Sequence, residues 1–390
     1  MRAHGVHQRH PHSLHIGLFL HDRVLPFIKK NAVLLIALCA AFVTTCIVPP
    51  DKAYLDYFDW KTLTCLFCVL AVVCALKNIR FFFFLAQKIV RAFKNARACV
   101  LALAYVTFIG SMLIANDMAL LTFLPLGYFV LSSTGKKKYM AFTFIIQNIA
   151  ANLGGMLTPF GNPQNLYLYT KFAIPTGEFM LIMLVPFLIS VALITLCCMI
   201  FVKKEEMTIE EEKITLPLGR TIIYGVLFAL SIVIVFRVIP FWTGLIVIPI
   251  ALLFLDRKAL GKVDYGLLLT FMAFFIFSGN MARIPAIQRV FGNLMGKNAL
   301  LVSTLSCQII SNVPSAILLS QFTGNYEALL LGVNIGGCGT LISSLASLIT
   351  FKEYTAHNHG GAKKYILLFS AFNFAFLGIL LGACALLLTI

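Results

Sequence analysis

The sequence predicts an all-α polytopic membrane protein made of two inverted repeats, each with a re-entrant hairpin and a broken transmembrane helix. Of its 390 residues, 60% are hydrophobic and 12% are charged, and several apolar runs reach the roughly 17–25 residues that cross a bilayer as a helix. Similar segments recur in the two halves of the chain. Glycines, prolines and asparagines interrupt apolar stretches, which a membrane tolerates only where the unwound backbone is buried in protein or lines a cavity.

Residues 1–30 are predicted to form a basic, histidine-rich leader and a degenerate first helix. The stretch MRAHGVHQRHPHSLH holds five of the eight histidines. A metal-binding tail is one interpretation, but a short disordered basic leader is favoured, because chain ends of biased composition are commonly poorly ordered. Residues 21–27 (HDRVLPF) resemble residues 235–241 (VFRVIPF), which indicates a shortened first spanning element before Arg23.

The first repeat is predicted over residues 31–202 and the second over 220–390, joined by a charged cytoplasmic linker at 203–219. Apolar length gives the spans of the first repeat as 31–49, 62–76, a broken helix at 139–172, and 178–202. The same criterion gives those of the second repeat as 220–238, 240–255, 264–281, a broken helix at 327–351, and 364–389.

Each repeat also contains an apolar run that polar residues interrupt near its middle, at 98–133 (IANDMALL) and at 298–323 (ISNVPSAILL). A run of about 35 residues suffices for two half-depth helices with the polar residues at their tip. We therefore predict a re-entrant hairpin in each repeat. Segments with spaced cations, 80–97 and 283–297, precede the hairpins and predict helices that lie in the membrane interface.

An internal match supports the repeats. DKAYLDYFDW at 51–60 aligns with DRKALGKVDY at 256–265 and places Asp51 on Asp256 and Asp59 on Asp264, at an offset of 205. The hairpin tips align at an offset of 196. Five crossings separate equivalent segments, and an odd number of crossings inverts the second repeat.

The net charge of +16 is best explained by membrane topology. All Lys and Arg residues lie between the apolar runs, and no soluble domain offers a basic face, so nucleic acid is not a predicted partner. With a cytoplasmic N-terminus, 24 of the 31 cations fall on the cytoplasmic side, as the positive-inside rule requires. The C-terminus then lies outside, which suits a multi-pass protein of a bacterial cytoplasmic membrane.

The first predicted binding site joins the first hairpin tip to the unwound part of the first broken helix. Glycines let carbonyl groups turn toward a cation, prolines free carbonyls from their helical donors, and asparagine amides both donate and accept. The predicted residues are Asn116, Asp117, Thr158, Gly161, Asn162, Pro163 and Asn165.

The second predicted site pairs the second hairpin tip with the second broken helix. Half-helix N-termini pointing inward give a positive field without a buried Lys or Arg, which suits a small anion. The predicted residues are Ser311, Asn312, Pro314, Ser315, Asn334, Gly336, Gly337, Gly339, Thr340, Ser343 and Ser344.

Asp117 is the only one of fifteen acidic residues inside an apolar run. A carboxylate there costs on the order of 3 kcal/mol or more, and a proton or a bound cation removes much of that cost. Coupling of transport to Asp117 is therefore favoured over a purely structural cap. No cofactor is predicted, and Na⁺ or H⁺ is the expected coupling ion. The predicted oxygen ligands for Na⁺ are Asn116, Asn162, Asn165 and Asn312.

These residues resemble the ion transporter superfamily, which includes citrate transporter-like, arsenite-efflux and divalent anion:sodium symporter permeases. ANDMALLTFLP and LISSLASL resemble arsenite-efflux proteins, and GNPQN resembles a motif of many permeases in the superfamily. The dicarboxylate branch carries Ser-Asn-Thr at both tips. The matching positions here are Ala115-Asn116-Asp117 and Ser311-Asn312-Val313, so both asparagines are kept and both threonines are replaced.

The resemblance implies a secondary transporter that works by elevator movement, usually as a homodimer. The hairpins and broken helices would slide against a scaffold, here the segments 31–49, 178–202, 240–255 and 364–389.

Three functions follow from these features. The first is an ion-coupled carrier of a small anion, either an organic acid such as citrate or a dicarboxylate, or an inorganic oxyanion. The second is a Na⁺/H⁺ antiporter in which Asp117 exchanges the two cations. The third is an arsenite efflux permease served by a separate ATPase, since the chain has no GxxxxGK[ST] motif. An enzyme is not predicted, because Asp117 has no acid partner for acid–base chemistry.

Overall fold

The computed structural model describes residues 32–207 and 215–389, and every regular element within these ranges is a helix. Seven segments are long and apolar enough to cross a membrane, which confirms an all-α, multi-pass membrane protein. The predicted leader at 1–30 and residues 208–214 of the predicted linker lie outside the described ranges. The seven segments are Trp60–Asn78, Ala96–Ile114, Lys137–Leu157, Thr176–Phe201, Leu218–Val235, Tyr265–Arg283 and Ala362–Leu387.

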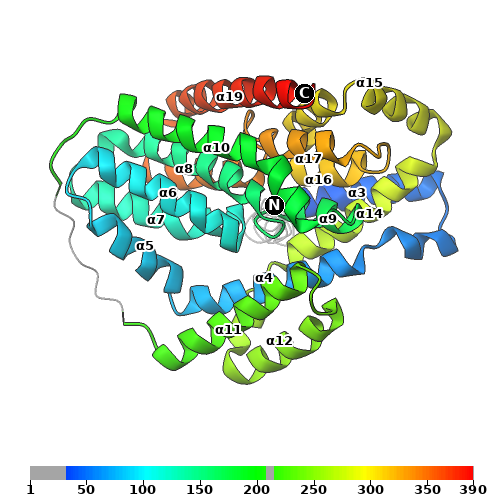
Figure 1. Cartoon of the computed structure of the whole chain (residues 1–390), viewed down its shortest axis with the longest axis horizontal. Helices are drawn as coiled ribbons and strands as arrows, with labels where there is room; N and C mark the ends of the chain where they lie inside the picture. Colours follow the sequence, from blue (N-terminus) through cyan, green and yellow to red (C-terminus); the bar gives the residue numbers. More distant parts are fainter. Residues whose placement is uncertain (1–31, 208–214, 390) are drawn as a thin grey trace, which may run out of the picture.

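The elements of the two halves follow one another in a similar order (Figure 1). Those of the first half are α3 (Ala32–Ile47), η2 (Lys52–Tyr57), α4 (Trp60–Asn78), α5 (Phe81–Arg91), α6 (Ala96–Ile114), α7 (Asn116–Ser133), η3 (Lys137–Tyr139), α8 (Met140–Gly154), η4 (Gly155–Leu157), α9 (Pro163–Lys171) and α10 (Thr176–Phe201). Those of the second half are α11 (Leu218–Val235), α12 (Phe241–Leu255), α13 (Arg257–Gly261), α14 (Tyr265–Arg283), α15 (Pro285–Ile310), α16 (Asn312–Leu319), α17 (Tyr326–Ile335), α18 (Leu345–His357) and α19 (Ala362–Leu387).

Equivalent side chains cap equivalent helices. The carboxylate of Asp59 accepts from the backbone of Thr62 at the start of α4, and Asp264 accepts from Leu267 at the start of α14, both at 2.9 Å. An N-cap of this kind satisfies an orphan N–H group of the first turn. The aspartates that the sequence aligns at an offset of 205 therefore perform the same local task.

An asparagine separates each amphipathic segment from the hairpin that follows it. Asn95 caps α6 by accepting from Ala98 at 2.9 Å. Asn298 has a non-helical backbone that divides α15, and its side chain accepts from Leu301 at 2.9 Å. The hairpin arms are thus α6 with α7, and the second part of α15 with α16.

The arms of the first hairpin are longer than the last arm of the second hairpin. The 19 residues of α6 and 18 of α7 correspond to about 28 and 27 Å, close to the thickness of the hydrocarbon core. By contrast, α16 has eight residues. How deeply each tip enters the membrane stays a prediction.

The two halves pack into each other. The first arms lie on the first parts of the broken helices, α6 on α8 and α15 on α17, whereas the later parts cross over, α9 against α16 and α18 against α7. Helix α3 packs on α14, and α11 and α12 pack on α4 at one edge, opposite α19 (Figure 1). Of the four predicted scaffold segments, α10 and α19 touch each other. The scaffold assignment stays a prediction.

Candidate functional site at the hairpin tips

Both hairpins turn through one residue with a positive φ. Ala115 has φ 65° and Ser311 has φ 73°, and such values are uncommon for residues other than glycine. The next residue is an asparagine in each case, and its Oδ1 accepts a hydrogen bond from the following backbone amide at 2.9 Å, Asp117 after Asn116 and Val313 after Asn312. Strained turns persist where the surroundings fix them, and they concentrate at functional sites.

The breaks in the two long helices also share a sequence and a backbone. NLGG begins at Asn152 and NIGG at Asn334, where the first part of each broken helix ends. The second parts start after Asn162 (φ −141°, ψ 146°) and Ser344 (φ −149°, ψ 143°), which have nearly the same extended conformation.

Asn152 connects the two halves of the site. Its Oδ1 accepts from Asn116 Nδ2 of the first hairpin tip at 3.1 Å and from Ser344 Oγ of the second break at 2.8 Å. Asn162 Nδ2 donates to the backbone oxygen of Asn152 at 3.4 Å. The first and second predicted sites, which the sequence analysis describes as separate, therefore meet at the buried side chain of Asn152.

A second asparagine pair holds the first break in shape. Asn165 Nδ2 lies 3.2–3.3 Å from the carbonyl oxygens of three residues in the break, and its Oδ1 accepts from Asn334 Nδ2 at 2.7 Å. Thr158 Oγ1 donates to the carbonyl of Met112 at 2.9 Å, which ties the break to the last turn of α6. Gly161 lies so close to the Gly155 carbonyl that a Cβ would come within 2.3 Å of it.

The second break is fixed by Gln308, near the end of α15. Its Nε2 donates to the carbonyls of Gly336 (2.9 Å) and Cys338 (3.0 Å), and its Oε1 accepts from the amide of Thr340 at 2.9 Å. Gly339 has φ 124° and lies directly against the side-chain amide of Gln308.

The second hairpin tip is joined to the same break through Ser343. The amide of Asn312 donates to the Ser343 carbonyl at 3.0 Å, and Ser343 Oγ donates to the Gly337 carbonyl at 2.8 Å. Ser315 Oγ donates to the Ser311 carbonyl at 2.7 Å, which closes the turn from within.

A cavity of about 770 Å³ brings the two tips together. Asp117 is the only charged residue in its described lining, which contains no Lys, Arg or His. The N-terminal ends of α7, α9, α16 and α18 all reach this lining. Helix N-termini carry partial positive charge, so the field at this point favours an anion. The predicted site residues that line the cavity are Asn116, Asp117, Pro163, Ser311, Asn312, Pro314 and Ser344.

The other predicted residues are not in that lining. They are Thr158, Gly161, Asn162, Asn165, Ser315, Asn334, Gly336, Gly337, Gly339, Thr340 and Ser343. Several of those with polar side chains form hydrogen bonds within and between the two breaks. Among the four predicted Na⁺ ligands, only Asn162 keeps an Oδ1 without a hydrogen-bond partner in the described structure. The Oδ1 atoms of Asn116, Asn312 and Asn165 already accept hydrogen bonds.

A sequence model of a family described as "citrate transporter" matches residues 17–330, most of the chain. The chain belongs to the citrate transporter family.

Two relatives agree with this assignment. An uncharacterized transporter of Methanocaldococcus jannaschii is 35% identical over 299 residues, 75% of this chain and 81% of the relative. The inner membrane protein YbiR of Escherichia coli (strain K12) is 28% identical over 311 residues, 77% of this chain and 82% of the relative. As a member of this family the protein is a membrane transporter of a small substrate, and not an enzyme.

Three polar residues of the site, Asn152, Gln164 and Gln308, are missing from the site residues predicted from the sequence. Asn152 and Gln164 lie within the NLGGMLTPFGNPQN stretch, so the unusual density of amides there was the available signal. Gln164 lines the cavity, and its buried Oε1 has no hydrogen-bond partner among the described residues. Gln308 gave no such signal, because α15 contains several polar residues and nothing in the sequence distinguishes Gln308 from the others.

Proposed function

We propose that this citrate transporter family member is a secondary active transporter that moves a small anion with Na⁺ or H⁺. The observation that supports it best is the cavity shared by both hairpin tips, where four helix N-termini converge without a cationic side chain in the described lining. Backbone amides and asparagine side chains bind carboxylates and oxyanions while leaving them able to dissociate. Substrates that fit are an organic acid such as citrate or a dicarboxylate, or an inorganic oxyanion.

Asp117 is the proposed coupling residue. It lies beside Asn116 at the cavity, and its buried Oδ1 has no hydrogen-bond partner in the described part of the chain. A charged carboxylate in that position costs on the order of 3 kcal/mol, and a proton or a Na⁺ ion removes much of the cost. Binding of the coupling ion therefore also removes a negative charge from the place where the anion binds.

The proposed transport cycle is an elevator movement of the hairpins and broken helices, in a homodimer. The contacts of α9 with α16 and of α18 with α7 join these elements into one unit, which supports a common movement. The proposed location is a bacterial cytoplasmic membrane, with the N-terminus in the cytoplasm and the C-terminus outside. The charge distribution along the sequence supports this orientation.

A Na⁺/H⁺ antiporter is the second candidate, favoured by one observation. Asp117 Oδ1 and Gln164 Oε1 are buried oxygen atoms without hydrogen-bond partners at the same cavity. Oxygen atoms of this kind are the ligands that hard cations prefer. In an antiporter Asp117 would bind Na⁺ and H⁺ in turn, Gln164 Oε1 would be a further ligand of Na⁺, and no anion would be required.

Thermal unfolding of the purified protein separates the two candidates. The screen uses citrate, dicarboxylates, arsenite and sulfate, each with and without Na⁺ and at two pH values. A ligand present at about 100 times its Kd stabilises the folded state by roughly 2.7 kcal/mol. The proposal expects an anion whose stabilisation grows with Na⁺ or with falling pH, and expects this dependence to be lost in Asp117→Asn.

Stabilisation by Na⁺ alone, lost in Asp117→Asn and independent of every anion, would contradict the anion carrier and support the antiporter. Asn293→Ala is the matched control, because Asn293 is exposed on α15 and is not in the cavity lining. It should leave every shift unchanged.

A further inference from the structure

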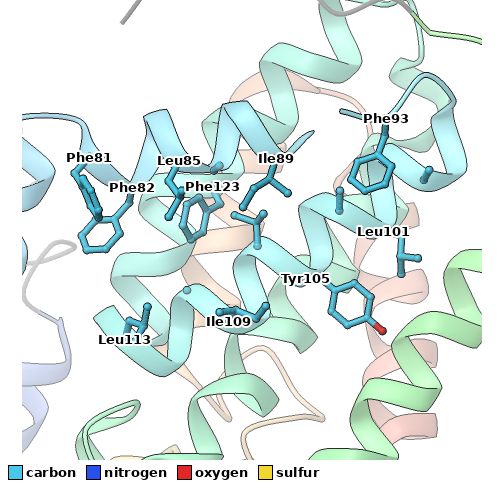
Figure 2. A pocket seen from close by; sticks show the side chains of 15 residues that line it. Phe81, Phe82, Leu85, Ile89, Phe93, Leu101, Tyr105, Ile109, Leu113 and Phe123 are labelled. Atoms are coloured by element: carbon cyan, nitrogen blue, oxygen red, sulfur yellow. The ribbon is translucent and has the colours of Figure 1, made fainter. Parts of the chain in front are cut away.

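An apolar pocket of about 280 Å³ lies between the amphipathic helix α5 and the hairpin arm α6, away from the transport cavity. Figure 2 shows Phe81, Leu85 and Ile89 of α5, with Phe93 just after it, on one side, and Leu101, Ile109 and Leu113 of α6 on the other. Small residues make the space: Ala86, Ala98, Ala102 and Gly110 are in the lining.

The pocket offers nothing to a polar ligand. Tyr105 is the only lining residue with a polar side-chain atom, and its hydroxyl is hydrogen-bonded to Thr195 Oγ1 of α10 at 2.5 Å. In Figure 2 this hydroxyl points away from the other labelled side chains. An occupant must therefore be apolar where it touches the lining.

The size and shape suit a hydrocarbon chain. Phe81, Leu85 and Ile89 follow one another on α5 at spacings of four, so they form a stripe along the helix of about 12 Å. The side chains of Leu85, Ile89 and Phe93 are each more than a third exposed. A volume of 280 Å³ accommodates roughly nine groups of the size of a water molecule, which corresponds to a stretch of acyl chain.

Cations are placed beside this stripe. Lys88 is exposed on α5, with its Nζ 4.6 Å from the centre of the Phe84 ring. Lys94 is exposed and follows Phe93, at one end of the pocket. Of the acids in the described part of the adjoining linker segment, Glu205 is held by Lys136 and Lys138, and Glu206 is exposed. A helix with a basic face and an apolar face binds the surface of an anionic membrane.

We infer that the pocket between α5 and α6 binds one acyl chain of an anionic phospholipid, with its head group next to Lys88 and Lys94. The lipid would fill the space between an interface helix and the first hairpin, and it would do so independently of the transported substrate.

Native mass spectrometry of the detergent-purified protein with added dioleoyl-phosphatidylglycerol tests the chain site. One tightly retained lipid per protomer is expected. Ala102→Phe fills the pocket and should lower retention about tenfold, the loss expected when roughly two methylene groups leave the pocket. Ala371→Phe is the control, because Ala371 is exposed on α19. Ala102→Leu replaces the larger variant if thermal unfolding shows that Ala102→Phe does not fold.

The head-group contact is tested with Lys88→Gln/Lys94→Gln and with dioleoyl-phosphatidylcholine. The double variant should retain less phosphatidylglycerol, and the unmodified protein should prefer phosphatidylglycerol to phosphatidylcholine. Lys363→Gln/Lys364→Gln, at the exposed start of α19, controls for net charge. Equal retention of both lipids, or retention that pocket filling does not change in either folded variant, would overturn the inference.

Discussion

The carboxylate of Asp51 accepts two hydrogen bonds from the guanidinium of Arg283, at 2.6 and 3.0 Å. The positions 205 residues away are Asp256 and Asn78, and Asp256 Oδ2 accepts from Asn78 Nδ2 at 2.9 Å. In one contact the first half of the chain supplies the acid, and in the other it supplies the partner. Two inverted repeats would produce such an exchange, so the pair of contacts supports the predicted repeat without testing its direction.

We call the Asp51–Arg283 contact and the Asp256–Asn78 contact the two clamps, and we expect each to stabilise the fold independently of the other. Asp51→Asn and Arg283→Gln should each lower the thermal unfolding midpoint, and the double variant should lower it by less than the sum, because both remove the same interaction. The same pattern is expected for Asp256→Ala and Asn78→Ala. Variants from different clamps should add. Additive losses within a clamp would show that the paired residues act separately.

Replacing Asn152 should disturb both halves of the site. Asn152→Ala removes the acceptor for Asn116 Nδ2 and Ser344 Oγ, and a buried donor left unsatisfied costs about 1–3 kcal/mol. Substrate-dependent stabilisation should disappear, and the thermal midpoint without substrate should fall. Asn373→Ala is the matched control, since Asn373 is a buried asparagine of α19 outside the cavity lining, whose Nδ2 bonds to the Phe369 carbonyl. If Asn152→Ala retains ligand binding, Asn152 does not join the two sites.

Gly339 should not tolerate a side chain. It has φ 124°, and a Cβ would lie 2.1 Å from Gln308 Oε1, the atom that accepts from Thr340. Backbone strain of this kind costs about 1–3 kcal/mol, so Gly339→Ala should lower stability by at least that amount and weaken transport. Gly177→Ala, in the first turn of α10 where a Cβ meets nothing within 4 Å, should be neutral or slightly stabilising. Equal behaviour of the two variants would argue against a fixed second break.

Acid should release the linker from the base of the first hairpin. Lys136, Lys138 and the Tyr139 hydroxyl donate to Glu205 and lower the pKa of its carboxyl to about 2. The folded-state value lies below the unfolded value of about 4.3, so the stabilisation is present above pH 4.3 and is lost as the pH falls toward 2. Thermal midpoints measured across this window should fall in the unmodified protein.

The variant Glu205→Gln isolates this contribution. It should be less stable than the unmodified protein near pH 6, and the difference should shrink as the pH falls from about 4.3 to 2. Glu206→Gln, the exposed neighbour, should follow the unmodified protein throughout. A constant difference between Glu205→Gln and the unmodified protein over this range would remove the assigned role of Glu205.

The sequence was sufficient for the helices and for the hairpin tips. Apolar length located the spanning helices to within a few residues, because the bilayer sets that length directly. The polar interruption at Asn116 and Asn312 located both turns, because an apolar run in a membrane tolerates polar residues mainly where its helix is broken and buried in protein.

The sequence was not sufficient for the contacts that join the two sites. Asn152 bonds to residues 36 and 192 positions away, and Gln308 bonds to the break about 30 positions later. Pairing of this kind depends on how α8, α15 and α18 pack, which no local pattern specifies. The sequence therefore predicts the residues near the tips, which are polar positions in apolar runs, but it does not predict their hydrogen-bond partners.

Uptake of a radiolabelled anion into proteoliposomes tests the central claim most directly. The anion is the one that gives the largest thermal shift, and uptake is driven by an inward Na⁺ or proton gradient. The account predicts that the unmodified protein and Asn293→Ala accumulate the anion, whereas Asn116→Ala and Asn312→Ala both lose accumulation. Undiminished uptake by either tip variant would contradict a site shared by the two hairpins, and gradient-driven cation movement that needs no anion would contradict anion transport.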